Sequence, residues 1–267
     1  MTSYEQLRQV TPHAAVVLAA NPGPMTLDGT NTWLLRAPGA SDAIVVDPGP
    51  NDKTHLSAVV AGAGHVASIL LTHGHVDHSA GAARLHELTG APVRALDPAH
   101  RLGGEGLAEG DAVAAAGVEL RVWATPGHTS DSLSFLLDPL GGTAAAVLTG
   151  DTILGRGTSI IAYPDGDLGD YLTSLRRLRE LGPATVLPGH GPELTAAGDV
   201  AAAYLAHRSQ RLEQVRAALD ALGPLDPDAA PRAVVEHVYA DVDQALWPAA
   251  ERSVRAQLAY LRGEGRH

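Results

Sequence analysis

Short apolar runs separated by turn sequences fill most of the chain. Runs rich in valine, leucine and isoleucine and bounded by Gly or Pro predict strands, the first three at residues 14–20, 31–36 and 43–47. A predicted helix, strand, helix and strand follow at residues 53–61, 68–72, 78–89 and 92–96. Further strands are predicted at residues 118–124, 132–137, 144–149 and 184–187, with a helix at residues 168–181. This order predicts a layered α/β protein.

A helical pattern replaces this alternation from residue 199 onward. Apolar positions recur with the helical period at residues 200–222, 233–240 and 249–261, and a link rich in Pro and Asp covers residues 223–231. We expect a main domain over residues 1–198 and a small helical module over residues 199–267. The apolar faces of these helices can pack within the module or form a homodimer, and the pattern leaves both open.

The composition is that of a well-packed globular protein, with 45% hydrophobic and 18% charged residues among 267. The 19 basic and 30 acidic residues give a net charge of -11, which disfavours broad attraction to nucleic acid or anionic lipid. No stretch reaches the roughly 20 apolar residues of a membrane span, and the N-terminus lacks the apolar run of a signal peptide. We expect a soluble cytoplasmic protein with no membrane partner.

The absence of cysteine restricts any metal site to histidine and carboxylate ligands. Four such side chains lie close together between a predicted strand and a predicted helix, namely His73, His75, Asp77 and His78. In an extended turn the side chains of His73 and His75 project on the same side. Asp77 and His78, at the start of the helix, lie on the other side of the point that all four side chains face. A lone histidine commonly caps a helix or bonds the backbone, but four clustered ligands favour a metal site.

Three more candidate ligands each follow a predicted strand and have a neighbouring glycine: His128, Asp151 and His190. Each motif alone is typical of an ordinary turn. Side chains at the tips of neighbouring strands converge, however, and glycine lets the backbone approach a metal closely. Their shared form predicts that all seven residues meet at one site.

The spacing of these seven residues resembles the complete ligand set of the metallo-β-lactamase superfamily. The resemblance covers residues 14–191 and implies an αββα sandwich. It also implies that a first metal ion binds to His73, His75 and His128 and a second to Asp77, His78 and His190, with Asp151 bridging them.

Two zinc ions per chain suit such nitrogen and oxygen ligands, although residue types alone leave iron and manganese open. Two close metal ions lower the pKa of a bridging water and give a hydroxide that attacks a carbonyl or phosphoryl centre. Asp77 is the candidate catalytic residue, because its carboxylate can face both the second metal and that water.

Within the superfamily, β-lactam hydrolysis is disfavoured, because β-lactamases of this fold commonly lack the bridging carboxylate and often use a cysteine. The chain resembles glyoxalase II and, more closely, β-lactamase-like protein 2, through residues 28–33 and 128–132 and a C-terminal module similar to a small winged helix. The resemblance implies hydrolysis of an ester, thioester or related acyl bond of a small molecule. Basic residues that would grip an anionic carrier such as glutathione are not evident beyond scattered arginines.

Other functions stay open at this point. Some members of the β-lactamase-like protein 2 group cleave single-stranded RNA, and helical spacing places Arg208, Arg211 and Arg216 either in a phosphate-contacting stripe or on a solvated face. A non-catalytic metal-binding scaffold is disfavoured, because seven ligands for two metals leave positions open to water. A di-iron redox role is disfavoured too, because relatives with that role usually carry glutamate at the position of His75.

Two residues outside the ligand set are candidates for supporting roles. Tyr163 lies in a predicted loop beside the metal pocket and can either contact substrate or pack the loop. Asp47 ends a predicted strand and can either hydrogen-bond a ligand histidine, fixing its tautomer, or cap a turn. Four other histidines are expected to be structural or exposed: His55, His65, His86 and His207.

Overall fold

The computed structural model describes residues 3–138, 145–241 and 243–264. Residue 144, the first of one predicted strand, lies outside the described residues. So do residues 242 and 265–267 of the expected helical module.

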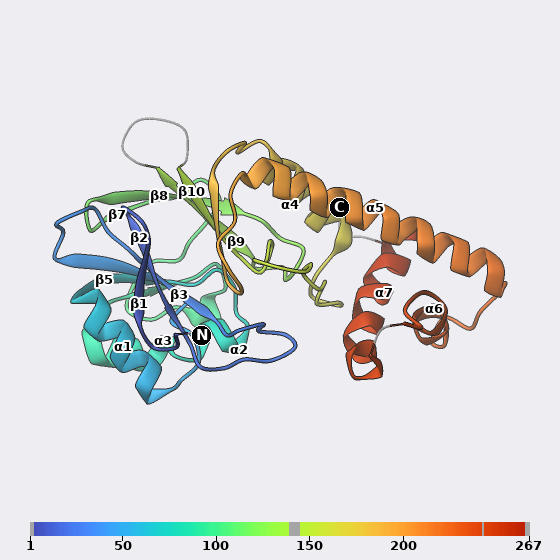
Figure 1. The fold of residues 1–267 in the computed structure, drawn as a ribbon, viewed down its shortest axis with the longest axis horizontal. Helices are drawn as coiled ribbons and strands as arrows, with labels where there is room; N and C mark the ends of the chain where they lie inside the picture. Colours follow the sequence, from blue (N-terminus) through green and yellow to red (C-terminus); the bar gives the residue numbers. More distant parts are fainter. Residues whose placement is uncertain (1–2, 139–144, 242, 265–267) are drawn as a thin grey trace.

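Two β-sheets form the larger part of the molecule (Figure 1). The first has the strand order β1-β2-β3-β4-β5-β6, with bounds Leu7–Thr11, Ala14–Leu18, Asn31–Leu35, Asp42–Val46, His65–Leu70 and Val93–Arg94. The second has the order β11-β10-β9-β8-β7, and from β7 to β11 the bounds are Ala112–Ala115, Val118–Ala124, Leu133–Asp138, Ala146–Gly150 and Thr185–Pro188. β5 is parallel to β4 and β6, and β10 is parallel to β11.

The inner faces of the sheets pack against each other, and helices cover the outer faces. Trp33 of the first sheet and Phe135 of the second are buried in the shared core. The helices α1 (Lys53–Ala63) and α3 (Ala82–Thr89) pack on the first sheet. The helices α4 (Leu168–Arg179) and α5 (Ala197–Leu222) pack on the second. This arrangement confirms the expected αββα sandwich.

Several elements differ from the predicted ones for local reasons. The apolar pattern does not predict β1, which is mostly exposed, or β7, which is rich in alanine, a poor strand former. The predicted helix at residues 78–89 is two helices, α2 (Val76–Ser79) and α3. Gly81 lies between them against the backbone of Gly49, where an added Cβ would lie 3.0 Å from the carbonyl oxygen. The predicted strand at residues 92–96 shortens to β6.

The C-terminal helices form a lobe beside the sandwich (Figure 1). It contains α6 (Ala230–Val238), the short 3-10 helix η2 (Gln244–Leu246) and α7 (Trp247–Leu261), packed on the second half of α5. The first half of α5 packs on α4, so this helix belongs to both hydrophobic cores. Among the described residues, no helix combines the length and apolar character that crossing a membrane requires.

The three arginines of α5 form neither a phosphate-contacting stripe nor one solvated face. Arg208 is only 4% exposed, Arg211 is half-buried against the ring of Tyr239, and Arg216 is exposed. Both sequence-based alternatives for the three arginines are therefore wrong. Helical spacing could not reveal this, because it does not show that α5 packs on the sandwich on one side and on the helical lobe on the other.

Candidate metal centre

Loops at one edge of the sandwich carry the candidate ligands. His73 and His75 follow β5, and the next helix, α2, contributes Asp77 and His78. The other three candidate ligands follow strands of the second sheet: His128 after β8, Asp151 directly after β10 and His190 after β11. Segments far apart in the sequence therefore meet between the ends of the two sheets.

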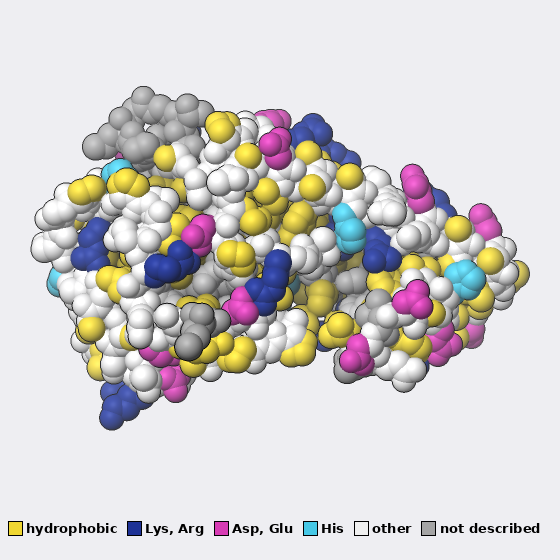
Figure 2. Space-filling view, in the orientation of Figure 1, with side chains coloured by type: hydrophobic (Ala, Val, Ile, Leu, Met, Phe, Trp, Pro, Cys, Tyr) yellow, Lys and Arg dark blue, Asp and Glu magenta, His cyan; other side chains and the backbone are white. Residues whose placement is uncertain are grey.

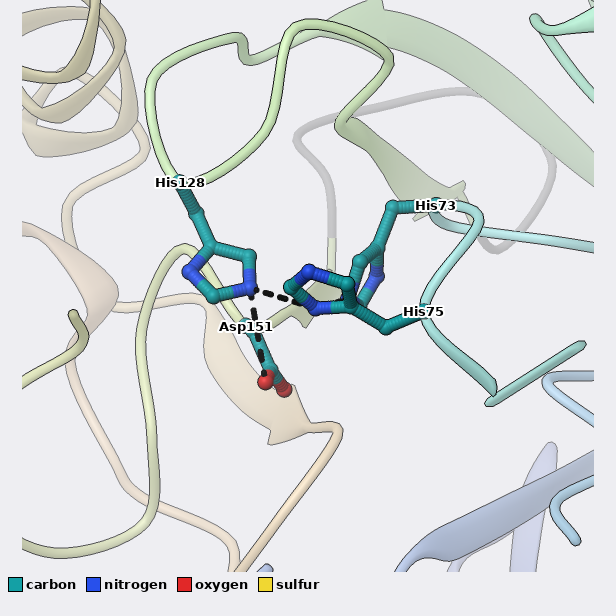
Figure 3. Close-up of side chains that lie close together, drawn as sticks. All are labelled: His73, His75, His128 and Asp151. Atoms are coloured by element: carbon teal, nitrogen blue, oxygen red, sulfur yellow. Dashed lines mark hydrogen bonds and ion pairs between the residues drawn. The ribbon is translucent and has the colours of Figure 1, made fainter. Parts of the chain in front are cut away.

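The first group of ligand atoms belongs to His73, His75, His128 and Asp151, all within 4.8 Å of one another (Figure 3). Nε2 of His73 lies 3.0 Å from Nδ1 of His75, and that Nδ1 lies 3.1 Å from Nε2 of His128. Ligands of a tetrahedral zinc ion at bond lengths of about 2.0–2.1 Å are roughly 3.3 Å apart. The spacing of these nitrogens therefore suits one metal ion.

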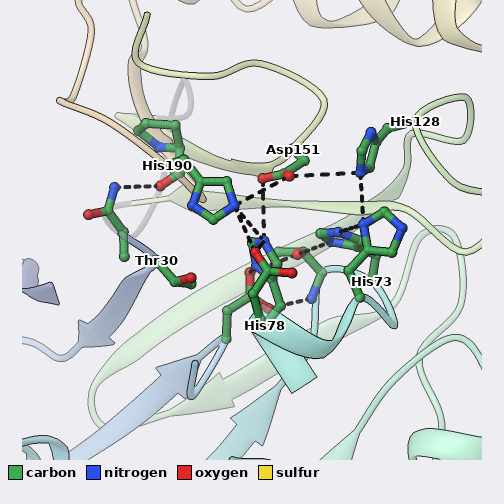
Figure 4. A network of polar contacts seen from close by, with 12 residues as sticks. Thr30, His73, His78, His128, Asp151 and His190 are labelled. Atoms are coloured by element: carbon green, nitrogen blue, oxygen red, sulfur yellow. Dashed lines mark hydrogen bonds and ion pairs between the residues drawn. The ribbon is translucent and has the colours of Figure 1, made fainter. Parts of the chain in front are cut away.

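The second group belongs to Asp77, His78 and His190. Nε2 of His190 lies 3.0 Å from Oδ2 of Asp77 and 3.1 Å from Nε2 of His78. Asp151 faces both groups (Figure 4). Its Oδ1 is 3.4 Å from Nε2 of His78, and its Oδ2 is 3.7 Å from Nε2 of His128. One carboxylate thus lies between the two groups of candidate ligands.

Backbone carbonyls fix the tautomers of two of these histidines. Nδ1 of His128 donates to the oxygen of Ile160 at 2.6 Å, and Nδ1 of His190 donates to the oxygen of Gly29 at 3.0 Å. Because a carbonyl can only accept, Nε2 of each neutral ring carries a lone pair directed into the site. Both rings are therefore oriented to bind a cation.

Asp47 orients one histidine from each group. Its Oδ2 accepts from Nδ1 of His78 at 2.8 Å and from the hydroxyl of Thr72 at 2.7 Å. Because the hydroxyl hydrogen points at Asp47, the hydroxyl oxygen accepts a hydrogen bond from Nδ1 of His73 at 3.0 Å. The predicted hydrogen bond from a candidate ligand histidine to Asp47 is confirmed, and Thr72 extends the contact to His73.

The charges of the site favour a bound cation. Burial lowers the pKa of His190, but the carboxylates of Asp151 and Asp77 raise it more, to about 9. Burial also lowers the pKa of His78, which Asp151 and Asp47 nevertheless raise well above its usual value. Burial raises the pKa of Asp151, yet His190 and His78 hold it well below the usual range. The metal-free site therefore takes up protons where cations would bind.

The arrangement of donors also fits metal ions. Oδ1 of Asp151 is buried and has no hydrogen-bond partner among the described residues. Its contact with Nε2 of His78 at 3.4 Å is longer than a hydrogen bond, and a bound cation would supply the close contact that this buried oxygen lacks. Gly189 lets Asp151 and His78 lie close to the backbone, because a Cβ at this position would lie 2.6 Å from this Oδ1 and from Cε1 of His78. Nitrogen and oxygen donors of this kind suit zinc or iron.

The remaining predicted residues lie outside the cluster. Tyr163 is 39% exposed in the loop after Ile160, and its contact with substrate stays a prediction. His55 is buried and bonded to Thr32, as expected for a structural histidine. His65 is exposed, and His86 bonds a backbone carbonyl.

Two polar side chains beside the cluster escaped the sequence analysis. A Cβ added to Gly74 would lie 2.6 Å from Nε2 of His100 and 3.3 Å from Oδ2 of Asp131. Both side chains therefore end beside the turn that carries His73 and His75. Proximity to His128 in the sequence was an available signal for Asp131. His100 belongs to the short 3-10 helix η1 (Pro98–His100), and no motif marked it.

Comparisons with known proteins agree with this geometry. Residues 25–190 match the family model of the metallo-beta-lactamase superfamily, and residues 230–266 match the beta-lactamase associated winged helix domain. A beta-lactamase-like protein 2 homolog of Caenorhabditis elegans is 32% identical, over 99% of this chain and 89% of its own length.

Two further comparisons concern a named activity and the fold. An atrochrysone carboxyl ACP thioesterase of Aspergillus fumigatus is 33% identical over 68% of this chain, which spans 57% of that relative. The crystal structure of a beta-lactamase domain protein from Burkholderia ambifaria superposes with a TM-score of 0.79 at 23% identity, covering 99% of this chain and 90% of that one. The chain thus belongs to the metallo-beta-lactamase superfamily, as a hydrolase of that fold with a C-terminal winged-helix domain.

Proposed function

We propose that the chain hydrolyses the thioester bond of a small acyl compound at a centre of two zinc ions. The observation that carries the proposal is the position of Asp151, whose carboxylate lies 3.4 Å from His78 and 3.5 Å from His190 of one group of candidate ligands and 3.7 Å from His128 of the other. The seven clustered side chains would hold the ions in the two groups described above. The similarity to a relative named as a thioesterase supports a thioester as the scissile bond.

Two zinc ions at this site would activate a water molecule as the nucleophile and polarise the carbonyl oxygen of the substrate. The protein supplies orientation and a proton acceptor. Asp47, Ile160 and Gly29 fix the rings of the candidate ligands. Asp77 is the proposed proton acceptor, because its side chain is 25% exposed, against 10% for Asp151.

The protonation state of Asp77 agrees with this role. Burial raises the pKa of its carboxyl, but the hydrogen bond from His190 and the charges of His78 and His190 lower it further, and the net shift is downward. The carboxylate is therefore ionised at neutral pH and can receive the proton that the attacking water loses.

Two other activities receive less support from the geometry. The arginine stripe that would favour single-stranded RNA is not formed, because Arg208 is buried. The carboxylate at position 151 and the absence of cysteine continue to disfavour β-lactam hydrolysis. Neither alternative gains a specific observation in its favour.

The proposal is tested by the turnover of four substrates by zinc-loaded protein: S-acetylpantetheine, nitrocefin, bis-p-nitrophenyl phosphate and a short single-stranded RNA. We expect thioester cleavage, and at least a roughly 100-fold lower rate in Asp77→Asn. Asp220→Asn, on the exposed face of α5, is the matched control. Faster cleavage of RNA or of the phosphodiester, lost in Asp77→Asn, would replace the thioester proposal with a phosphodiesterase.

A further inference from the structure

The loop between β10 and α4 contributes to the metal centre at two points. Asp151 begins this loop, and Ser159 and Ile160 lie further along it, against the ring of His128. Nδ1 of His128 lies 2.6 Å from the carbonyl oxygen of Ile160 and 3.2 Å from the hydroxyl oxygen of Ser159. The position of residues 159–160 therefore decides the orientation of one candidate ligand.

The segment at residues 156–160 has little support of its own. It belongs to no helix or strand, and among the described residues it makes no hydrogen bond between backbone groups. Residues 158–160 also line a cavity of about 280 Å³ between the sandwich and the helical lobe. Figure 2 shows a histidine and basic side chains gathered along α5 at this junction. Close packing does not fill this side of the segment, so side chains have to hold it in place.

Arg208 of α5 supplies such support. The residue is 4% exposed, and one of its terminal nitrogens donates a hydrogen bond to the carbonyl of Ser159. Its guanidinium lies 5.0 Å from the ring centre of Tyr171, whose hydroxyl donates to the carbonyl of Thr152 at 2.7 Å. Arg208 thus contacts the segment at residues 156–160 and a ring that is bonded to the start of the same loop.

A second residue of α5 holds the loop between these two points. Tyr204 lies one helical turn before Arg208, and its hydroxyl bonds both the N–H and the carbonyl of Leu154. Because residues four positions apart lie on the same face of a helix, Tyr204 and Arg208 face the loop together. The loop is therefore held from one face of a helix that belongs to neither sheet.

The charge of Arg208 serves no ion pair among the described residues. Its Nε is buried and has no hydrogen-bond partner in the same part of the chain. An uncompensated buried charge lowers the stability of a fold. The hydrogen bond that Arg208 does make goes to the segment that contacts His128. This combination favours a role in positioning over a role in stabilisation.

We propose that Arg208 is a positioning residue of the first metal site. By holding the carbonyl of Ser159, it keeps the carbonyl of Ile160 against Nδ1 of His128, so that Nε2 of this ring is directed at the metal ion. A planar guanidinium suits this role because it fixes several donors in set directions. The inference rests on the proposed binding of two metal ions and is independent of the thioester as substrate. Metal affinity in the sandwich then depends on a helix shared with the helical lobe.

The two dissociation constants for zinc test the inference, measured by competition with a chromophoric chelator. Arg208→Met keeps the apolar part of the side chain and removes its donors and charge. It should raise one dissociation constant by about tenfold or more and leave the other unchanged. Proton–nitrogen NMR identifies the weakened site, because zinc binding there shifts the Nε2 signal of His128. Arg208→Lys keeps the charge and a donor without the planar geometry, so its loss should be smaller.

Arg211→Met is the matched control. Arg211 lies on the next turn of α5, where its guanidinium is 4.9 Å from the ring centre of Tyr239 and donates to Oε1 of Gln214 at 2.8 Å. Both zinc constants of this variant should equal those of the wild type. Unchanged constants in Arg208→Met, a loss shared equally by both sites, or an equal loss in Arg211→Met would overturn the inference.

The ring of His128 provides a measurement that needs no metal. In the metal-free wild type, NMR should show the neutral ring with its proton on Nδ1, and Arg208→Met should add the tautomer with the proton on Nε2. If the wild type does not bind two zinc ions, the proposed function fails and this measurement decides on Arg208. A changed tautomer population supports its role, and an unchanged one overturns it. If Arg208→Met does not fold, Arg208→Lys replaces it, and wild-type values in that variant overturn the inference.

Discussion

Asp47 connects the two groups of candidate ligands through a single carboxylate. It accepts hydrogen bonds from His78 and from the backbone and hydroxyl of Thr72, which in turn contacts His73. The side chain is 2% exposed, so no water can replace these contacts without rearrangement. One residue that binds no metal in this account therefore sets the orientation of a ligand in each group.

Asp47→Asn is expected to lower zinc affinity by roughly 10–100-fold, because an amide accepts fewer hydrogen bonds and carries no charge to stabilise the ligand rings. Asparagine tolerates the left-handed backbone of this position, where φ is 52°. Competition with a chromophoric chelator measures the affinity. Asp42→Asn, at the exposed start of β4, is the control. Wild-type affinity in Asp47→Asn would contradict the role assigned to Asp47.

Gly189→Ala tests the crowding around Asp151. The added Cβ would lie 2.6 Å from Oδ1 of Asp151 and from Cε1 of His78, so both side chains have to move. We expect less bound zinc per chain and at least a roughly tenfold lower turnover, with the fold retained. Elemental analysis and circular dichroism measure these effects. Gly62→Ala is the control, because its Cβ would meet only the ends of two leucine side chains, and it should keep both zinc and turnover. A full zinc content in Gly189→Ala would contradict the close contact of residue 189 with Asp151 and His78.

The residues that meet at the site could largely be predicted from the sequence, because chemistry and spacing mark them. His73, His75, Asp77 and His78 fall within six residues, and glycine-flanked strand ends present the other three. Contacts made only through folding could not be predicted in this way. His100 reaches the site from a separate 3-10 helix, and the burial of Arg208 depends on how α5 packs.

At the scale of elements, strands with strong apolar runs were predictable, whereas elements stabilised by their neighbours were not. The predicted strand at residues 118–124 has the bounds of β8 itself, since its residues alternate between buried and exposed. β1 has no such alternation and is held by antiparallel pairing with β2. The length of α5 was nearly predictable from its periodicity, but its contacts with two cores were not.

The helix α5 also stabilises the loop that follows Asp151. The hydroxyl of Tyr204 accepts from the N–H of Leu154 at 3.1 Å and donates to the carbonyl of the same residue at 3.2 Å. Tyr204→Phe leaves both buried groups unpaired, so the free energy of unfolding should fall by about 1–3 kcal/mol. Urea denaturation measures this loss. Tyr260→Phe, which removes a hydroxyl without a hydrogen bond in the described part of the chain, should change stability little, and equal effects would contradict the prediction.

For the whole molecule, proton uptake at the metal-free site links stability to pH. The pKa of His190 is raised from 6.5 to about 9, and the pKa of His78 is raised in the same direction. This stabilisation is complete below pH 6.5 and is lost as the pH rises through 9. Chelator-treated protein should therefore lose stability across that interval, by an amount on the order of 3 kcal/mol from His190.

Bound zinc should reverse the dependence of stability on pH. The metal replaces the protons on the ligand histidines, and its apparent affinity rises with pH. Thermal unfolding of chelated and zinc-loaded protein between pH 6.5 and 9 checks both parts. We expect Tm to fall in the chelated protein and the difference between the two forms to widen. A Tm of the chelated protein that rises over this interval would contradict the charge arrangement assigned to the site.

The central claim is that two zinc ions, bridged by Asp151, perform thioester hydrolysis. The measurement that tests it most directly is a zinc titration of chelator-treated protein, with S-acetylpantetheine hydrolysis as the readout. The account predicts no activity without metal, activity that saturates at two zinc ions per chain, one for each group of ligands, and none of this recovery in Asp151→Asn. Full hydrolysis by metal-free protein, or saturation at one zinc ion with Asp151→Asn unaffected, would contradict it.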